Sequence, residues 1–274
     1  METNRRFQGT LLHIASRWPT YLFGYGGGAV VALLLIVAGA VRRDWGLIPF
    51  GAILLLVVAY FFGANVWAAY RRYDVRGQRP ADLFYHLGHM TPTTTFVHVS
   101  MGVRRLPQQL NRRLTSGRVL ALDLYNPQQA PGAALARARQ ATAPAQPDPR
   151  LRWMEGSIQL LPLPDRSTSL VTADGALGAL WQHGDRLILM REIYRILRPE
   201  GWAILAEPVR TQTNWLVRGS GALRLEPVTY WRHLFDLCGF NVVREQDVDG
   251  LVHYFVVERP AVGEMQQLTL DLGV

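Results

Sequence analysis

A few residues have the types and positions that proton transfer would need. Asp174 ends an apolar segment in the string TADGAL, and His183 follows in the string WQHGD. A carboxylate or an imidazole can remove a proton from a bound molecule, so each residue is a candidate general base. The alternatives are a turn or helix-cap role for Asp174 and a solvent-exposed position for His183.

The string FVHVSMGVRRL, residues 96–106, is a candidate binding turn. An apolar run leads through Ser100 to Gly102, and a helix-like pattern follows, which is where a nucleotide-binding fold places its glycine-rich turn. Only one glycine is present. The string by itself therefore leaves open a degraded cofactor turn, a different loop in the same place, and an accidental likeness.

The composition excludes several kinds of chemistry. All 29 basic residues are arginine, which excludes a Schiff base on lysine and a phosphate-loop lysine. A single cysteine, Cys238, allows no internal disulfide, and its place in LFDLCGF predicts a core position. His86 and His89 lie three residues apart without a cysteine or a clear acidic partner, so we expect no metal site.

The net charge of +8 is unevenly distributed. Residues 1–79 contain nine Arg and three acidic residues, a balance of +6, whereas residues 80–274 carry only +2. The excess lies beside apolar segments, where arginine usually sets membrane topology and contacts anionic headgroups. We therefore expect a lipid bilayer and no nucleic acid as a partner.

Two uncharged apolar runs, residues 18–41 and 45–70, dominate the N-terminal part. Each exceeds the roughly 20 residues that a helix needs to cross a bilayer, and aromatic residues lie near their ends. The short link predicts an antiparallel transmembrane hairpin over residues 18–70. A signal peptide is the alternative, since Ala38-Gly39-Ala40 resembles a cleavage site, but the length of the first run and the second run behind it favour the hairpin.

The arginine distribution predicts the orientation of this hairpin. Arginines precede the first run and follow the second, with only Arg42 and Arg43 between them, so both termini are expected in the cytoplasm and the protein in the inner membrane. Residues 1–17 are expected as a short interfacial segment, helical through Phe7, Leu11, Leu12 and Ile14. Gly24 and Gly28 have a spacing that allows close helix packing. Residues 71–83 form a basic linker.

Residues 84–259 alternate between strand and helix patterns, and residues 260–274 form a tail. This order predicts an α/β domain with a mostly parallel seven-stranded sheet that ends in an antiparallel hairpin. Residues 185–201 predict a helix that Pro199 and Gly201 stop. The expected strands lie within residues 91–100, 117–124, 151–157, 167–175, 202–208, 241–248 and 253–260.

Several strings in this region resemble the class I S-adenosylmethionine-dependent methyltransferases, closest to the ubiquinone and menaquinone methyltransferase branch. The strings are LMREIYRILRPEGWAILAEP at 189–208, MEGSIQLLPLPDRSTSLVTADGAL at 154–177, and ALDLYNP followed by ALARAR. The resemblance implies a Rossmann-like fold and S-adenosylmethionine as the cofactor.

The resemblance also assigns cofactor-binding positions around the first strand. The acidic residue that ends this strand in the family aligns with His98, and the three glycines of the family's turn align with Ser100, Gly102 and Arg104. In one interpretation Gly102 provides the tight turn and Arg104 pairs with the methionine carboxylate. In the other, Arg104 blocks the site.

Two further positions follow from the same resemblance. Asp123 ends the second strand 21 residues after Gly102 and matches the carboxylate that accepts hydrogen bonds from ribose hydroxyls. Ser157, after Gly156, stands where the family places an acidic residue against adenine.

The sequence thus leads to two functional hypotheses. The first is a membrane-anchored methyltransferase that acts on a lipophilic or other small-molecule acceptor. The second is a non-catalytic subunit whose hairpin docks against other transmembrane subunits while the methyltransferase-like domain caps the complex. A lipid-binding module in the former cofactor cleft is a third, less supported possibility.

Overall fold

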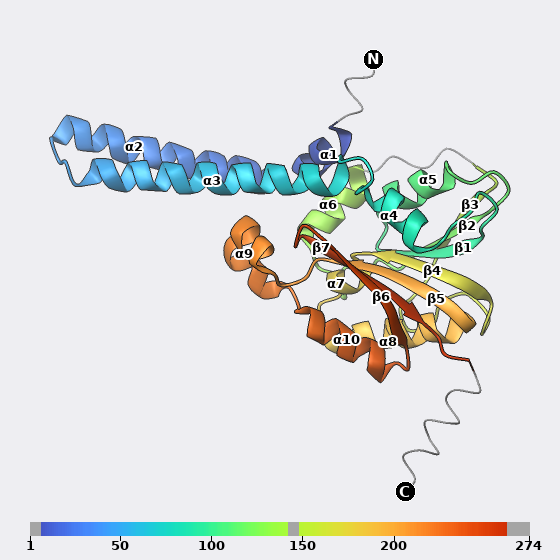
Figure 1. Cartoon of the computed structure of the whole chain (residues 1–274). Helices are drawn as coiled ribbons and strands as arrows, with labels where there is room; N and C mark the ends of the chain where they lie inside the picture. The colour runs from blue at the N-terminus through green and yellow to red at the C-terminus, as the bar shows by residue number, and fades with distance from the viewer. Residues whose placement is uncertain (1–6, 142–147, 262–274) are drawn as a thin grey trace, which may run out of the picture.

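The structure is a computed structural model that describes residues 7–141 and 148–261. Its centre is a seven-stranded sheet in the order β3-β2-β1-β4-β5-β7-β6, in which β7 runs antiparallel to both neighbours (Figure 1). This arrangement confirms the predicted α/β fold. The strands are β1 (Phe96–Ser100), β2 (Val119–Asp123), β3 (Leu151–Glu155), β4 (Thr168–Asp174), β5 (Leu197–Glu207), β6 (Asn241–Val248) and β7 (Val252–Glu258).

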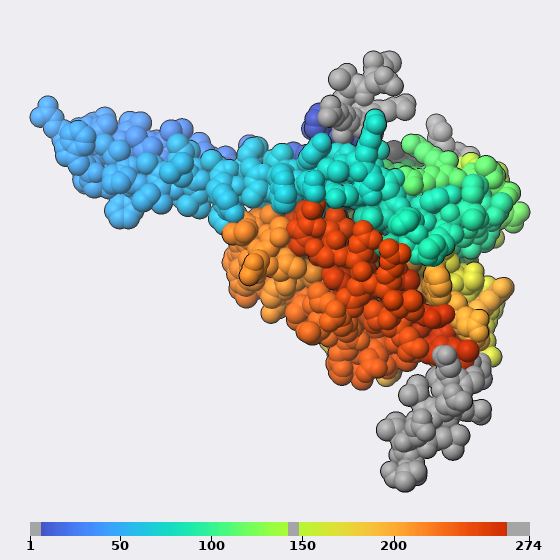
Figure 2. Space-filling model, viewed as in Figure 1, coloured from blue at the N-terminus to red at the C-terminus, as the bar shows by residue number. Residues whose placement is uncertain are grey.

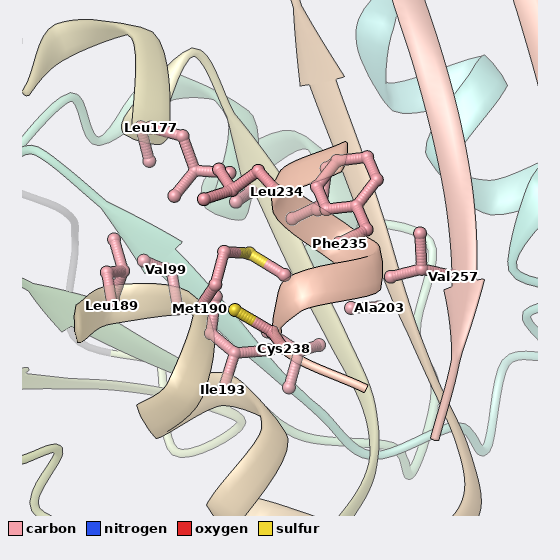
Figure 3. Close-up of a cluster of buried hydrophobic side chains, with 14 of the residues drawn as sticks. Val99, Leu177, Leu189, Met190, Ile193, Ala203, Leu234, Phe235, Cys238 and Val257 are labelled. Atoms are coloured by element: carbon pink, nitrogen blue, oxygen red, sulfur yellow. The ribbon is translucent and has the colours of Figure 1, made fainter. Parts of the chain in front are cut away.

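Helices cover both faces of the sheet, as parallel strands buried on two sides require. One hydrophobic cluster joins the sheet to α7, α8 and α10, and a second joins it to α4 and α5. Figure 3 shows Cys238 inside the first cluster, beside Met190 and Ile193, which confirms its predicted core position. The helices of this domain are α4 (Pro80–Leu87), α5 (Arg105–Asn111), α6 (Ala133–Ala141), α7 (Ala176–Ala179), α8 (His183–Ile196), α9 (Gln212–Arg218), the 3₁₀ helix η3 (Gly219–Arg224) and α10 (Val228–Leu237).

The N-terminal part forms a long helical hairpin that projects from the domain (Figures 1 and 2). Its helices are α1 (Gln8–Ser16), the π-helix η2 (Thr20–Gly26), α2 (Gly27–Arg42) and α3 (Leu47–Tyr73). Residues Thr20–Arg42 and Leu47–Tyr73 are long and apolar enough to cross a membrane. Most of their large apolar side chains are exposed, among them Phe23, Leu34 and Leu56.

Small residues allow α2 and α3 to approach each other closely. A Cβ atom on Gly28 would lie 2.9 Å from Cγ2 of Val58, and one on Gly51 would lie 2.7 Å from the backbone oxygen of Ala32. Of the predicted pair, Gly28 packs against α3, whereas the nearest atom to a Cβ on Gly24 belongs to Thr20 of its own helix, at 3.8 Å.

Helix α1 folds back onto the end of α3. The backbone N–H groups of Gly9 and Thr10 donate to the Asp74 carboxylate at 3.0 and 2.8 Å, and the Thr10 hydroxyl donates at 2.6 Å. Phe7 contacts the Tyr70 ring of α3, whereas Leu11 and Leu12 are exposed. Only residues 7–17 of the predicted 1–17 segment lie in the described part of the chain.

Two helix ends differ from the predicted ones. Helix α3 continues past residue 70 to Tyr73, and α8 ends at Ile196, before Pro199 and Gly201. The reason for the second difference is Arg259, whose guanidinium donates to the backbone oxygens of Tyr194 and Leu197 at 2.8 and 2.7 Å. These contacts satisfy carbonyls at the helix end, so the chain turns into β5 at Leu197.

Candidate active site

A cavity of about 270 Å³ lies at the carboxyl ends of β1 and β4. This is the edge at which open parallel sheets bind ligands. The sheet contributes His98, Ser100, Asp174 and Gly175 to its wall, and helix α6 closes one side. Val103 and Leu106, which follow β1, also line the cavity. The rest of the wall comes from the N-terminal part, through His13, Ser16, Arg17, Arg72 and Tyr73.

His98 forms part of the cavity wall on the sheet side. Its Nδ1 atom lies 2.9 Å from Oγ1 of Thr172, and the residue is buried. Burial lowers the pKa of His98 to about 3, so the imidazole is neutral at physiological pH. A neutral imidazole can accept or donate one hydrogen bond but adds no charge to the cavity.

Asp174 lies on the same wall, at the end of β4. Its Oδ1 accepts a hydrogen bond from Nη2 of Arg72 at 2.8 Å, and both side chains are largely buried. Ser100 ends β1, and its hydroxyl donates to the backbone oxygen of Val103 at 3.2 Å. The predicted residues Asp174 and Ser100 therefore share one cavity, and Arg72 from the hairpin fixes the orientation of the carboxylate.

Gly102 forms the turn after β1 with a positive φ of 82°, a conformation that favours glycine. A Cβ atom on Gly102 would overlap the guanidinium of Arg139, which comes from α6. Nη2 of Arg139 donates to Oδ2 of Asp123 at 2.6 Å, and its Cζ lies 4.2 Å from the centre of the Tyr125 ring. Arg139 thus occupies the space over the turn and engages the carboxylate predicted to bind ribose.

Arg104, at the start of α5, contacts an aromatic ring. Its Cζ is 5.6 Å from the centre of the Trp153 ring on β3, and it does not line the cavity described above. The residue that covers Gly102 is Arg139, which the sequence did not single out. The available signal was its position in the helix ALARAR, directly after the strand that Asp123 ends.

Gly156 and Ser157 follow β3, next to the end of β2. The Gly156 N–H donates to the backbone oxygen of Asp123 at 3.0 Å, and a Cβ atom on Gly156 would lie 2.9 Å from Leu124. Gly156 is thus closely packed against Leu124, and a larger residue here would require this side chain to shift. Ser157 is exposed, and its hydroxyl bonds to Gln159.

His183 begins α8 outside the cavity. Its Nδ1 lies 2.7 Å from the Tyr230 hydroxyl, which also accepts a hydrogen bond from Arg186 at 3.0 Å. Of the two candidate bases, Asp174 is the one that lines the cavity.

Sequence reasoning missed Glu207, at the end of β5. The residue is fully buried, and its two oxygens accept hydrogen bonds from the backbone N–H groups of Leu177 at 2.9 Å and Gly178 at 3.1 Å. Burial raises the pKa of Glu207 to about 8. The only sequence signal was an acidic residue at the end of an apolar strand, in ILAEP.

The residues present at this site match S-adenosylmethionine in part. Gly102 provides a tight turn for the cofactor's backbone contacts, and Asp123 provides a carboxylate for the ribose hydroxyls. The cavity of about 270 Å³ borders the same turn through Ser100 and Val103. Arg139 fills the space between Gly102 and Asp123, but it is a long side chain that is one-third exposed (32%). The fit therefore depends on the position of one side chain and not on the backbone.

Comparisons with known proteins agree with this geometry. Residues 97–205, which run from β1 into β5, match a protein family described as a methyltransferase domain. No match was found among curated protein sequences.

Several solved structures are similar to this chain at low sequence identity. The [4+2]-cyclase SpnF is 15% identical with a TM-score of 0.51, over 69% of this chain and 83% of that one. A SAM-dependent methyltransferase from Aquifex aeolicus is 14% identical, with a TM-score of 0.46 over 66% of this chain and 94% of that one. One from Methanosarcina mazei is 12% identical, with a TM-score of 0.48 over 64% and 96%.

The family match and the strand order lead to the same assignment. Residues 97–205, less than half of the chain, resemble a methyltransferase domain, and the sheet has the Rossmann-like strand order that this resemblance implies, with S-adenosylmethionine as the implied cofactor.

Proposed function

We propose that this protein is a membrane-attached methyltransferase that transfers a methyl group to a lipophilic acceptor. The observation that carries the proposal is the cavity at the ends of β1 and β4, whose wall is shared between the sheet and the base of the apolar hairpin. An acceptor dissolved in a bilayer would reach this cavity along the hairpin. Because a [4+2]-cyclase has the same fold, the fold alone does not fix the reaction.

The exposed surface of the hairpin supports attachment to a bilayer. Many large apolar side chains along both helices are exposed, and lipid tails would cover them. Helix α9 lies beside α3, where Gly219 approaches Phe61, and it exposes Trp215 and Leu216 (Figure 1). The excess of arginine before the first helix and after the second favours an orientation with both ends of the chain in the cytoplasm.

The chain's own residues have defined roles in this proposal. S-adenosylmethionine supplies an electrophilic methyl group when it is bound. Asp174, oriented by Arg72, accepts the proton of an acceptor hydroxyl or an acidic carbon. His98 presents a neutral imidazole to the same cavity, and α1 shields the site from water. Asp123 binds the ribose hydroxyls after Arg139 has moved away.

A second candidate function is that of a non-catalytic subunit in a membrane complex. The Arg139–Asp123 ion pair favours it, because this pair fills the space over the cofactor turn. In that case other transmembrane subunits would cover the exposed faces of α2 and α3.

Calorimetric titration of the full chain in detergent with S-adenosylmethionine separates the two functions. The variant Arg139→Ala opens the space over Gly102 and releases Asp123. The lost ion pair and ring contact are together worth about 1–2 kcal/mol, so the variant is expected to bind roughly five- to thirtyfold more tightly than the wild type. Arg112→Ala, at an exposed arginine of the same domain, is the matched control and should leave the affinity unchanged.

Absence of binding at millimolar cofactor in both the wild type and Arg139→Ala would refute the methyltransferase proposal and favour the non-catalytic subunit. If the cofactor binds, incubation with methyl-labelled cofactor and a total membrane lipid extract tests the acceptor class. Label is expected in the organic phase.

A further inference from the structure

Three arginines from separate parts of the chain meet at the base of the hairpin. Arg17 follows α1, Arg72 lies in the last turn of α3, and Arg218 ends α9. All three line a cavity of about 50 Å³ that also contacts His13 and Asn214. Arg17 and Arg72 line the larger cavity as well, so the two spaces adjoin.

The charges of this arginine cluster (Arg17, Arg72 and Arg218) are not balanced within the described residues. Asp174 is the only acidic residue among those that line the two cavities, and it bonds to Arg72 alone. Burial, followed by Arg17 and Arg72, lowers the pKa of Arg218 to about 10. Burial and the three arginines lower the pKa of His13 to about 3, so His13 adds no charge and the cluster keeps an excess of two positive charges.

One buried donor in the cluster has no acceptor, and two of its guanidinium groups have no ion-pair partner among the described residues. Nε of Arg72 is buried without a hydrogen-bond partner. In the described part of the chain, the guanidinium groups of Arg17 and Arg218 form no ion pair. Buried charged donors normally find partners, because each unpaired group is costly. A bound anion would provide several acceptor oxygens at once.

The size and place of the cavity indicate the kind of anion. A single water molecule needs about 10–15 Å³ of cavity volume. The cavity at the arginine cluster has about 50 Å³ and can therefore hold a group of several heavy atoms. Guanidinium groups match the oxygens of a phosphate in charge and geometry. The cluster also lies at the level where the apolar hairpin ends, close to Trp18, which is the level that lipid headgroups occupy in the proposed orientation.

We propose that Arg17, Arg72 and Arg218 form a binding site for a phosphate group, carried by an anionic membrane lipid. The site holds the headgroup beside the larger cavity and leaves the acyl chains along the exposed face of the hairpin. It does not depend on methyl transfer, because phosphate binding needs only the hairpin, α1 and α9 in their observed places.

Calorimetry on the full chain in detergent tests this site with three probes. These are dihexanoyl phosphatidic acid, dihexanoyl phosphatidylcholine and inorganic phosphate. The wild type is expected to bind phosphatidic acid at least tenfold more tightly than phosphatidylcholine. Arg17→Gln and Arg218→Gln should each weaken this binding by roughly ten- to a hundredfold, the value of one charge-assisted hydrogen-bonding partner.

The control variant is Arg76→Gln, which removes an exposed arginine that follows α3, near the same end of the hairpin. It should change the affinity for phosphatidic acid by less than a few fold. Arg218→Lys keeps the charge and should recover part of the lost affinity, which separates binding from folding. The melting midpoint of each variant verifies that the protein is folded.

The possible outcomes identify the source of the phosphate. Tight, variant-sensitive binding of phosphatidic acid with weak binding of inorganic phosphate supports the lipid headgroup. If phosphatidic acid and inorganic phosphate bind equally well, and Arg17→Gln and Arg218→Gln weaken both, the site is supported with free phosphate as its ligand. Equal affinity for the two lipids, or equal loss in Arg76→Gln, overturns the inference. Titration with S-adenosylmethionine on the same samples shows separately whether the proposed methyltransferase function holds.

Discussion

Glu207 allows a direct test of the electrostatics beside the cavity. The residue is fully buried at the end of β5, and burial raises its pKa from 4.5 to about 8. At pH 7 the folded protein therefore holds a proton on Glu207, whereas the unfolded chain does not. A raised carboxyl pKa stabilises the folded state at low pH, and this stabilisation is lost as the pH rises through 8.

The size of the effect follows from the two pKa values. Stability changes by about 1.4 kcal/mol per pH unit while the folded and unfolded states differ by one proton. Between pH 7 and pH 9 the contribution of Glu207 to the free energy of unfolding falls by about 1.4 kcal/mol. The fall is smaller than the full two-unit value because Glu207 is half deprotonated in the folded protein at pH 8 and almost fully deprotonated at pH 9. For a protein of this size, this corresponds to a fall in melting temperature of about 3–6 °C.

Thermal unfolding of the full chain in detergent at pH 7, 8 and 9 measures this loss. In Glu207→Gln no proton can leave, so the fall between pH 7 and pH 9 should disappear, even though the amide is a poorer acceptor for the two backbone N–H groups and lowers stability overall. Glu155→Gln changes an exposed glutamate and should keep the wild-type slope. An unchanged slope in Glu207→Gln would show that Glu207 is ionised in the folded state at neutral pH.

Further variants test the packing of the hairpin and the end of α8 by their melting temperatures. Gly51→Ala places a Cβ atom 2.7 Å from a backbone oxygen of α2, so we expect a loss of about 1–3 kcal/mol. Gly63→Ala has open space around it and should be neutral or stabilising by up to about 1 kcal/mol; a clear loss there would contradict the observed packing. Arg259→Met removes the donor to Tyr194 and the neighbouring carbonyls and should cost about 3 kcal/mol, whereas an unchanged midpoint would mean that other groups end α8.

The sheet was predictable because its strands have local signals. Apolar runs bounded by turn residues marked each strand, and alternation with helices indicated a parallel order. The turn at Gly102 was predictable for the same reason, since it follows directly after β1. The end of α8 was not, because it depends on Arg259, which lies more than 60 residues further along the chain.

The content of the site was less accessible to sequence reasoning. The position of Arg139 over Gly102 depends on how α6 packs, and Arg137 of α6 donates to the backbone oxygen of Ser16 at 2.8 Å. This contact joins residues 121 positions apart, and so no local pattern encodes it. The wall that α1 adds to the cavity likewise depends on the contact between Asp74 and Thr10.

Helix α3 runs without interruption from the exposed apolar part of the hairpin to the wall of the cavity. Its 27 residues extend for about 40 Å, which is longer than the roughly 30 Å of bilayer hydrocarbon. In the proposed placement the helix tilts to match the membrane, and a thinner bilayer requires a larger tilt. Arg72 and Tyr73 at its end belong to the cavity wall, so a change in tilt moves that wall relative to β1 and β4. If the protein spans a bilayer in this way, bilayer thickness would influence ligand affinity, and reconstitution in lipids of different chain length would test this consequence.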